Sequence, residues 1–120
     1  MARILIVDDS IVSRTNLKNI LLDAQHEIVG EGVNGEDGLE KFLALRPDMV
    51  TMDITMPKLN GIECLKEILR HDSEARVMMI SALGQGAKIL EAINCGARHY
   101  ITKPYEPDKV LEAVTELLSE

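Results

Sequence analysis

Short apolar runs alternate along the chain with longer segments in which apolar residues recur every three or four positions. The runs lie at about residues 3–8, 27–33, 48–53, 76–81 and 99–103, and most of their residues are Ile, Val, Leu or Met. Runs of this length are typical of buried strands, and the segments between them have the period of amphipathic helices. The pattern therefore predicts five successive βα units, which means an α/β fold with a five-stranded parallel sheet and helices on both faces.

Turn and capping residues mark where the predicted helices begin and end. Ser10 is the predicted N-cap of the first helix, Asn34-Gly35 forms a turn before the second, and Gly96 ends the fourth. The glycines at 84 and 86 predict a flexible loop ahead of that fourth helix. The apolar positions at helical spacing are Leu17, Ile20, Leu21 and Ala24 in the first helix, Ile62, Leu65, Ile68 and Leu69 in the third, Leu90 and Ile93 in the fourth, and Val110, Ala113, Val114, Leu117 and Leu118 in the fifth.

Composition narrows the class of protein. A chain of 120 residues suffices for one domain with a single core. The formal net charge of −7 argues against binding to nucleic acid, which needs a basic stripe that no segment supplies. Cys64 and Cys95 match no zinc or redox spacing, and no signal peptide, membrane span or lipidation motif stands out. We therefore expect a cytoplasmic protein with reduced thiols, and no direct binding to a membrane.

Reactive side chains stand at the ends of four predicted strands. Asp8 and Asp9 close the first strand, Asp53 the third, Ser81 the fourth and Lys103 the fifth. Because the carboxyl ends of parallel strands share one edge of a sheet, three carboxylates, a hydroxyl and an ammonium are expected to converge there. Carboxylates in one cleft repel each other unless a cation or protons neutralise them. A hard divalent metal and a phosphoryl group are the expected ligands.

Four sequence motifs resemble those of the response-regulator receiver family. They are IVDDS at 6–10, DITMP at 53–57, MISA at 79–82 and ITKP at 101–104, and they occur in the family's order at the strand ends. The resemblance spans the whole chain and implies a flavodoxin-like sheet with strand order 2-1-3-4-5. It also implies a single receiver domain over residues 1–120 without an output domain, most similar to the stand-alone receivers of chemotaxis.

The resemblance implies a phosphoacceptor and a magnesium site. Asp53 would accept the phosphoryl group, and a bound Mg²⁺ would screen the repulsion between this carboxylate and an anionic donor. Asp9 and Asp53 would bind the metal directly, and Asp8 would bind it through a water because Mg²⁺ keeps several waters. The backbone carbonyl of Thr55 would supply a further ligand.

Other residues would hold and report the phosphoryl group. Lys103 is suited to pair with a phosphoryl oxygen, or with Asp53 in the empty state. Ser81 offers a hydroxyl donor, and Ala82 beside it leaves room for the anion. In the family the bond before the proline of this motif is cis, so Pro104 is a candidate cis proline. Tyr100 holds the position of an aromatic that turns inward on activation, although a half-buried strand tyrosine is the alternative.

Two positions near the site would set how long the phosphoryl group survives. Thr55 and Leu83 stand two residues beyond Asp53 and Ser81, on the route by which water reaches the phosphorus. Leu83 is apolar and cannot orient a water molecule, so we expect slow dephosphorylation unless a phosphatase supplies the missing group.

The resemblance implies a phosphorylation-activated regulator that is not an enzyme acting on other substrates. Its phosphoryl donor would be the phosphohistidine of a chemotaxis-type kinase. As a monomer, it would bind a flagellar switch protein and a phosphatase through the face formed by the fourth helix, fifth strand and fifth helix, where Lys88, Ile89, Tyr100 and Lys109 lie.

Other functions are compatible with part of the pattern. The chain could relay phosphate to a phosphotransfer protein or regulate a target outside the flagellum, since one fold serves all these uses. An aspartate-nucleophile phosphohydrolase would place its nucleophile on the first strand in a D-x-D arrangement, and here Asp8 and Asp9 are adjacent. A receiver-like module that never takes phosphate is disfavoured because all five site residues are present.

Overall fold

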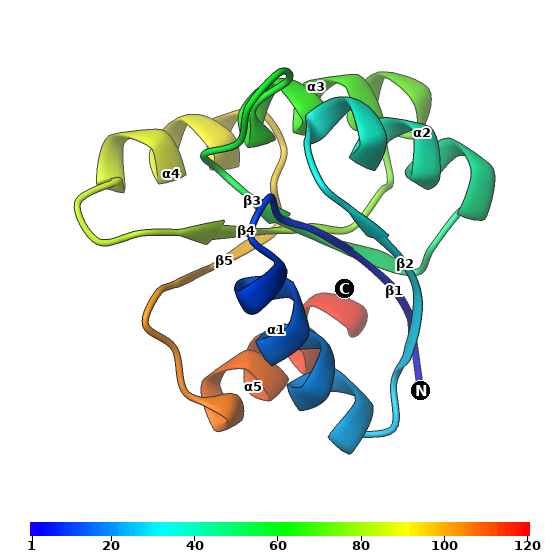
Figure 1. The fold of residues 1–120 in the computed structure, drawn as a ribbon. Coiled ribbons are helices and arrows are strands. Elements are labelled where there is room, and N and C mark those ends of the chain that lie inside the picture. Colours follow the sequence, from blue (N-terminus) through cyan, green and yellow to red (C-terminus); the bar gives the residue numbers. More distant parts are fainter.

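Strands and helices alternate strictly along the computed structural model, which describes all residues 1–120 (Figure 1). The elements are β1 (Arg3–Val7), α1 (Ile11–Asp23), β2 (Glu27–Gly32), α2 (Gly35–Leu45), β3 (Met49–Asp53), α3 (Gly61–His71), β4 (Val77–Ser81), α4 (Gly86–Asn94), β5 (His99–Thr102) and α5 (Pro107–Leu118). All neighbouring strands are parallel, and their order is β2-β1-β3-β4-β5. This confirms the predicted α/β fold and strand order.

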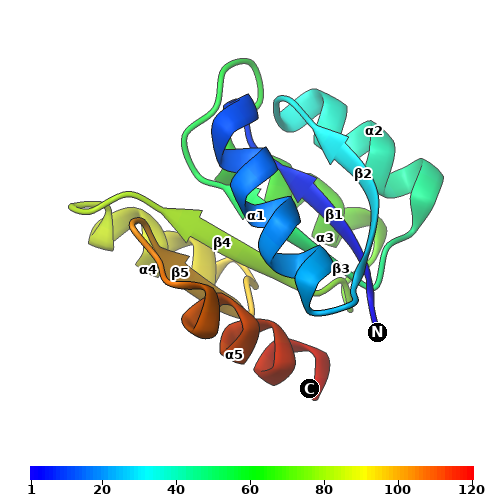
Figure 2. The same ribbon diagram turned by 60° about the horizontal axis from the view of Figure 1, so that its bottom comes forward.

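The sheet separates two hydrophobic cores. Helices α2, α3 and α4 cover one face, and α1 and α5 cover the other (Figures 1 and 2). Successive strand residues point to opposite faces, so Leu5 and Val7 of β1 join the first core while Ile4 and Ile6 join the second. The methionines of the central strands, Met49, Met52, Met78 and Met79, are all buried, as predicted for residues that pack strand faces.

The expected helix ends are present. The Ser10 side chain accepts a hydrogen bond from the Ser13 N–H and begins α1, and Asn34 does the same for α2 through the Asp37 N–H. Gly96 follows α4 with a φ of +116°, a backbone conformation that favours glycine. None of the helices is both long enough and apolar enough to cross a membrane.

The structure differs from the sequence prediction around α4. Gly86 is the first residue of this helix and not part of a loop before it. Leu90 and Ile93 are 61% and 42% exposed, and α4 packs on the sheet through Ala92 and the half-buried Ile89 instead. The reason is that α4 lies toward the β5 edge of the sheet, so only a narrow stripe of the helix finds a surface to cover (Figure 1).

The start of α3 rests directly on the backbone at the end of β3. The Gly61 N–H donates to the Ile54 carbonyl at 2.8 Å. A Cβ atom at Gly61 would lie 2.0 Å from the carbonyl oxygen of Asp53 and 2.8 Å from the Cα of Ile54. Only glycine allows this approach, and the packing holds in place the turn that carries the Asp53 side chain.

We expect Gly61→Ala to lower the free energy of unfolding by ~1–3 kcal/mol, because the methyl group must push α3 away from β3. Urea unfolding measures the loss. Gly86→Ala is the matched control: its Cβ would meet nothing within 4 Å, so its stability should stay equal or rise by less than ~1 kcal/mol. Equal losses in the two variants would contradict the packing argument.

Candidate functional site

Three carboxylates meet at the carboxyl edge of the sheet. The register of β1 against β3 places Val7 beside Met52, so the residue that follows β1, Asp8, lies next to Asp53. One carboxylate oxygen from each of Asp8, Asp9 and Asp53 lies within 4.8 Å of the others. The structure thus brings together the three acidic residues that the sequence predicted to converge.

Burial makes this proximity costly. Asp8 is 3% exposed and Asp53 is 9% exposed. Burial, with the negative charges of Asp8 and Asp9, raises the pKa of Asp53 to about 6, although Lys103 acts in the opposite direction. The charge of Asp53 is therefore only partly balanced by the protein, and a cation placed among the three carboxylates would remove the repulsion.

Lys103 approaches the carboxylates from β5, a strand at the edge of the sheet. It follows β5 directly, and its Nζ lies 3.4 Å from the Asp8 Oδ2, 3.7 Å from the Asp53 Oδ1 and 3.4 Å from the Ser13 Oγ. Burial works against the ammonium, but the charges of Asp53 and Asp8 outweigh it and raise the pKa of Lys103. The bond between Lys103 and Pro104 is cis, as expected for this candidate.

The Ser81 hydroxyl is engaged with β5. Ser81 is fully buried at the end of β4, where its Oγ lies 3.3 Å from the Thr102 Oγ1 and donates to the Ile101 carbonyl at 3.4 Å. Thr102 was not among the predicted site residues. The signal that could have found it is the parallel register of β4 and β5, which pairs Ser81 with Thr102.

The backbone beside Ser81 also has an internal partner. The Ala82 N–H donates to the Gln85 Oε1 at 2.7 Å, and the Gln85 Nε2 donates to the Thr55 Oγ1 at 2.8 Å. This amide bridges the loops that follow β3 and β4. Gln85 was not among the predicted site residues, because a glutamine in a loop has no periodic or motif signal.

Arg14 binds the backbone of the turn that carries Asp8, and it too was not among the predicted site residues. Its Nη1 donates to the Asp8 carbonyl at 2.7 Å, and its Nε pairs with the Glu31 Oε1 at 3.1 Å. Arg14 is 9% exposed, on the same buried side of α1 as Leu17. A buried arginine needs partners, so an arginine three positions before a core leucine was the available signal.

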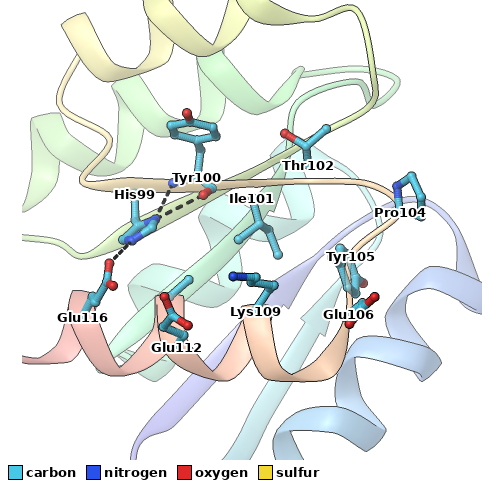
Figure 3. Close-up of a pocket in the computed structure, with 11 residues that line it drawn as sticks. His99, Tyr100, Ile101, Thr102, Pro104, Tyr105, Glu106, Lys109, Glu112 and Glu116 are labelled. Carbon is cyan, nitrogen blue, oxygen red and sulfur yellow. Dashed lines mark hydrogen bonds and ion pairs between the residues drawn. The ribbon is translucent and has the colours of Figure 1, made fainter.

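Tyr100 and Leu83 lie outside the site itself. Tyr100 is 44% exposed and points to the opposite side of β5 from His99 and Ile101 (Figure 3). Leu83 is 76% exposed in the loop after β4. The structure therefore places the predicted reporter, Tyr100, outward and leaves the apolar Leu83 side chain in contact with solvent.

The donor set fits a magnesium ion. Asp8, Asp9 and Asp53 offer three carboxylate oxygens, the hard ligands that Mg²⁺ prefers, and the mutual repulsion of these groups favours a divalent cation over an empty cleft. The backbone carbonyl of Thr55, two residues after Asp53, is the predicted additional ligand.

Comparison with known proteins places the chain in a family. Residues 4–115 match the response regulator receiver domain. The chain is 47% identical to the chemotaxis protein CheY of Thermotoga maritima over 115 residues, 96% of each chain. It is also 47% identical to CheY of Bacillus subtilis over 117 residues, 98% of each chain. Its structure matches the CheX–CheY–BeF3–Mg²⁺ complex from Borrelia burgdorferi with a TM-score of 0.94 and 38% identity, covering 98% of this chain and 90% of that one.

The chain therefore belongs to the response-regulator receiver family, whose members are signalling regulators. Within that family it is a homologue of the CheY chemotaxis regulators.

We expect Asp53→Asn to stabilise the metal-free protein at pH 7. The pKa of Asp53 is about 6 in the folded protein and near the ordinary aspartate value of 3.8 in the unfolded chain. The wild-type free energy of unfolding should therefore fall as pH rises from 4 to 6 and stay lower above that range, a cost that the amide avoids. The gain at pH 7 should be ~1–3 kcal/mol and should vanish near pH 4.

Chemical denaturation in EDTA at several pH values measures this difference. Asp108→Asn, at an exposed acid of α5, is the control and should show no such pH dependence. Addition of Mg²⁺ should stabilise the wild type more than Asp53→Asn. A variant that is no more stable than the wild type at pH 7 would argue against carboxylate repulsion in the site.

Proposed function

We propose that this protein is a phosphorylation-activated two-component response regulator of chemotaxis that acts in the cytoplasm. The observation that carries the proposal is the buried, poorly neutralised Asp53, which lies beside two further carboxylates and within 3.7 Å of the Lys103 ammonium. Membership of the receiver family and near full-length identity to CheY proteins support it.

The reaction would be a phosphoryl transfer to Asp53. A carboxylate oxygen of Asp53 attacks the phosphorus of a phosphohistidine on the donor kinase. The bond between phosphorus and the imidazole nitrogen breaks, and its electron pair stays on that nitrogen, which leaves an acyl phosphate on Asp53. Asp8, Asp9 and the Thr55 carbonyl would hold Mg²⁺ together with Asp53. When bound, the ion supplies positive charge that screens the two anions from each other.

Three donors would hold the new phosphoryl group in exchange for their present partners. The Lys103 ammonium already lies between Asp8 and Asp53, so it needs little movement to reach a phosphoryl oxygen. The Ser81 hydroxyl would leave the Ile101 carbonyl and Thr102 to donate to the same group, and the Ala82 N–H, which donates to Gln85 in this structure, lies next along the chain. The charge changes only at Asp53, and the exchange of hydrogen-bond partners would transmit this change to β5.

The output would be read on the face formed by α4, β5 and α5. Leu90, Ile93 and Tyr100 are exposed apolar or aromatic side chains on this face. A groove between β5 and α5, lined among others by Tyr105 and Lys109, adjoins it (Figure 3). We propose this face as the binding surface for a flagellar switch protein. The Borrelia CheY forms a complex with CheX. We also propose that a phosphatase binds this protein on the same face.

Incubation with Mg²⁺ and acetyl phosphate tests the proposal. We expect intact-mass spectrometry to find one phosphoryl group per chain, labile to hydroxylamine and absent from Asp53→Asn. EDTA should abolish the reaction, because the carboxylates then repel the donor. Asp48→Asn, at an acid outside the site, is the control and should be phosphorylated normally. Multiple turnover of a phosphoester would instead indicate a phosphohydrolase, and no modification would indicate a bare interaction module.

The exposed Leu83 makes the phosphorylated form long-lived, because it offers no atom to orient an attacking water. Leu83→Glu should therefore shorten the half-life of the acyl phosphate by about tenfold, less than the roughly 10²–10⁴-fold of a fully positioned general base because the side chain is exposed. Loss of the phosphoryl group after dilution from the donor measures it. Leu83→Met, which keeps an apolar side chain, should leave the half-life unchanged. An unaltered half-life in Leu83→Glu would show that this position does not control water access.

A further inference from the structure

Gln85 joins the two loops that flank the phosphoacceptor. Its Oε1 accepts from the Ala82 N–H at 2.7 Å, and its Nε2 donates to the Thr55 Oγ1 at 2.8 Å. Ala82 follows Ser81 on one loop, and Thr55 lies two residues beyond Asp53 on the other. The glutamine amide therefore spans the opening between the ends of β3 and β4.

Helix capping does not account for this amide. Gln85 occupies the N-cap position of α4, but its side chain makes no hydrogen bond to the first turn of the helix. Residues that serve as N-caps accept from the N–H two or three positions later, whereas the Gln85 amide points back toward Ala82 and across to Thr55. Both hydrogen bonds of the Gln85 amide instead connect the loop after β4 with the loop after β3.

The Ala82 N–H is the group for which two acceptors compete. A backbone N–H has one hydrogen to donate, and Gln85 holds it in this structure. The proposed function assigns the same donor to a phosphoryl oxygen. An anionic oxygen forms a charge-assisted hydrogen bond, stronger than one to a neutral amide, so the phosphoryl group would win this exchange. The Gln85 side-chain amide must still move away from the Ala82 N–H before the phosphoryl oxygen can take its place.

We propose that Gln85 is a positioning residue that holds the phosphoacceptor loops in the unphosphorylated arrangement and opposes entry of a phosphoryl group. This inference rests on the proposed function and adds to it a residue that sets the ease of phosphorylation. The site accepts a phosphoryl group only while the bridge is open. Its apparent affinity is therefore the intrinsic affinity multiplied by the fraction of time that the bridge is open. Both hydrogen bonds are exposed and neutral, and if together they are worth about one typical intramolecular hydrogen bond, the factor is about three to ten.

Phosphorylation of Gln85→Ala tests the proposal. We expect the rate constant at sub-saturating acetyl phosphate and fixed Mg²⁺ to rise about three- to tenfold over the wild type. The affinity for beryllium fluoride in the presence of Mg²⁺ should rise by the same factor. Asn94→Ala, which removes an exposed amide from the same helix, is the matched control and should change neither quantity.

Thr55→Val supplies a second test of the bridge. It removes the hydroxyl that accepts from the Gln85 Nε2 and keeps the backbone carbonyl. If Thr55 and Gln85 act through one bridge, the double variant should be phosphorylated no faster than Gln85→Ala alone. Additive effects would show that the two residues act separately, and would overturn the bridge as the cause.

Hydrogen exchange at the Ala82 amide measures the bridge without any phosphorylation. In the metal-free and phosphate-free protein, the Ala82 N–H should exchange about three- to tenfold faster in Gln85→Ala than in the wild type. With beryllium fluoride and Mg²⁺ bound, the amide should be protected equally in both proteins. A wider loss of structure in Gln85→Ala would instead leave the Ala82 amide less protected than in the wild type with the ligand bound as well.

The outcomes separate this inference from the proposed function. If the wild type is phosphorylated on Asp53 but Gln85→Ala reacts at the same rate or more slowly, the inference is overturned and the proposed function stands. If the wild type takes up neither a phosphoryl group nor beryllium fluoride, the proposed function fails and the inference falls with it. Unfolding by urea, expected to be similar for both proteins, excludes a general loss of structure.

Discussion

The repulsion between Asp53 and its acidic neighbours is the constraint on which the rest of the structure depends. The sheet brings the ends of β1 and β3 side by side, so Asp8 and Asp9 cannot avoid Asp53. Lys103 compensates only part of this charge, and the pKa of Asp53 remains at about 6. A fold that keeps carboxylates this close forgoes stability, and a divalent cation bound among them would recover it.

The groups that would hold a phosphoryl group already have internal partners. Lys103 contacts Asp8 and Asp53, the Ser81 hydroxyl contacts Thr102, and the Ala82 N–H donates to Gln85. No strong donor is left unpaired in the site, which would be costly in a partly buried position. Phosphorylation would therefore exchange one set of hydrogen bonds for another, and such an exchange favours two discrete conformations over a gradual change.

The strand β5 links the site to the proposed binding face. Side chains two residues apart on a strand point to the same side, so Thr102 and Tyr100 share one face of β5 (Figure 3). Loss of the contact between Ser81 and Thr102 would alter the space next to Tyr100. The exposed Leu90 and Ile93 of α4 would extend the proposed binding face with apolar side chains.

The sequence by itself determined the five βα units and the residues at the strand ends, because periodicity and the order of apolar runs are properties of neighbouring residues. From these, the convergence of Asp8, Asp9, Asp53, Ser81 and Lys103 followed once the strands were taken as parallel. Only the tertiary structure decided that Arg14 supports Asp8, that Thr102 holds Ser81, and that α4 faces the sheet with Ala92. The bridge from Gln85 to Thr55 belongs to the same group. The contacts of Thr102, Ala92 and Gln85 join elements that lie far apart in the chain, and the contact between Arg14 and Asp8 joins α1 to the turn before it. Their geometry depends on strand register and on which part of each helix finds a surface to cover.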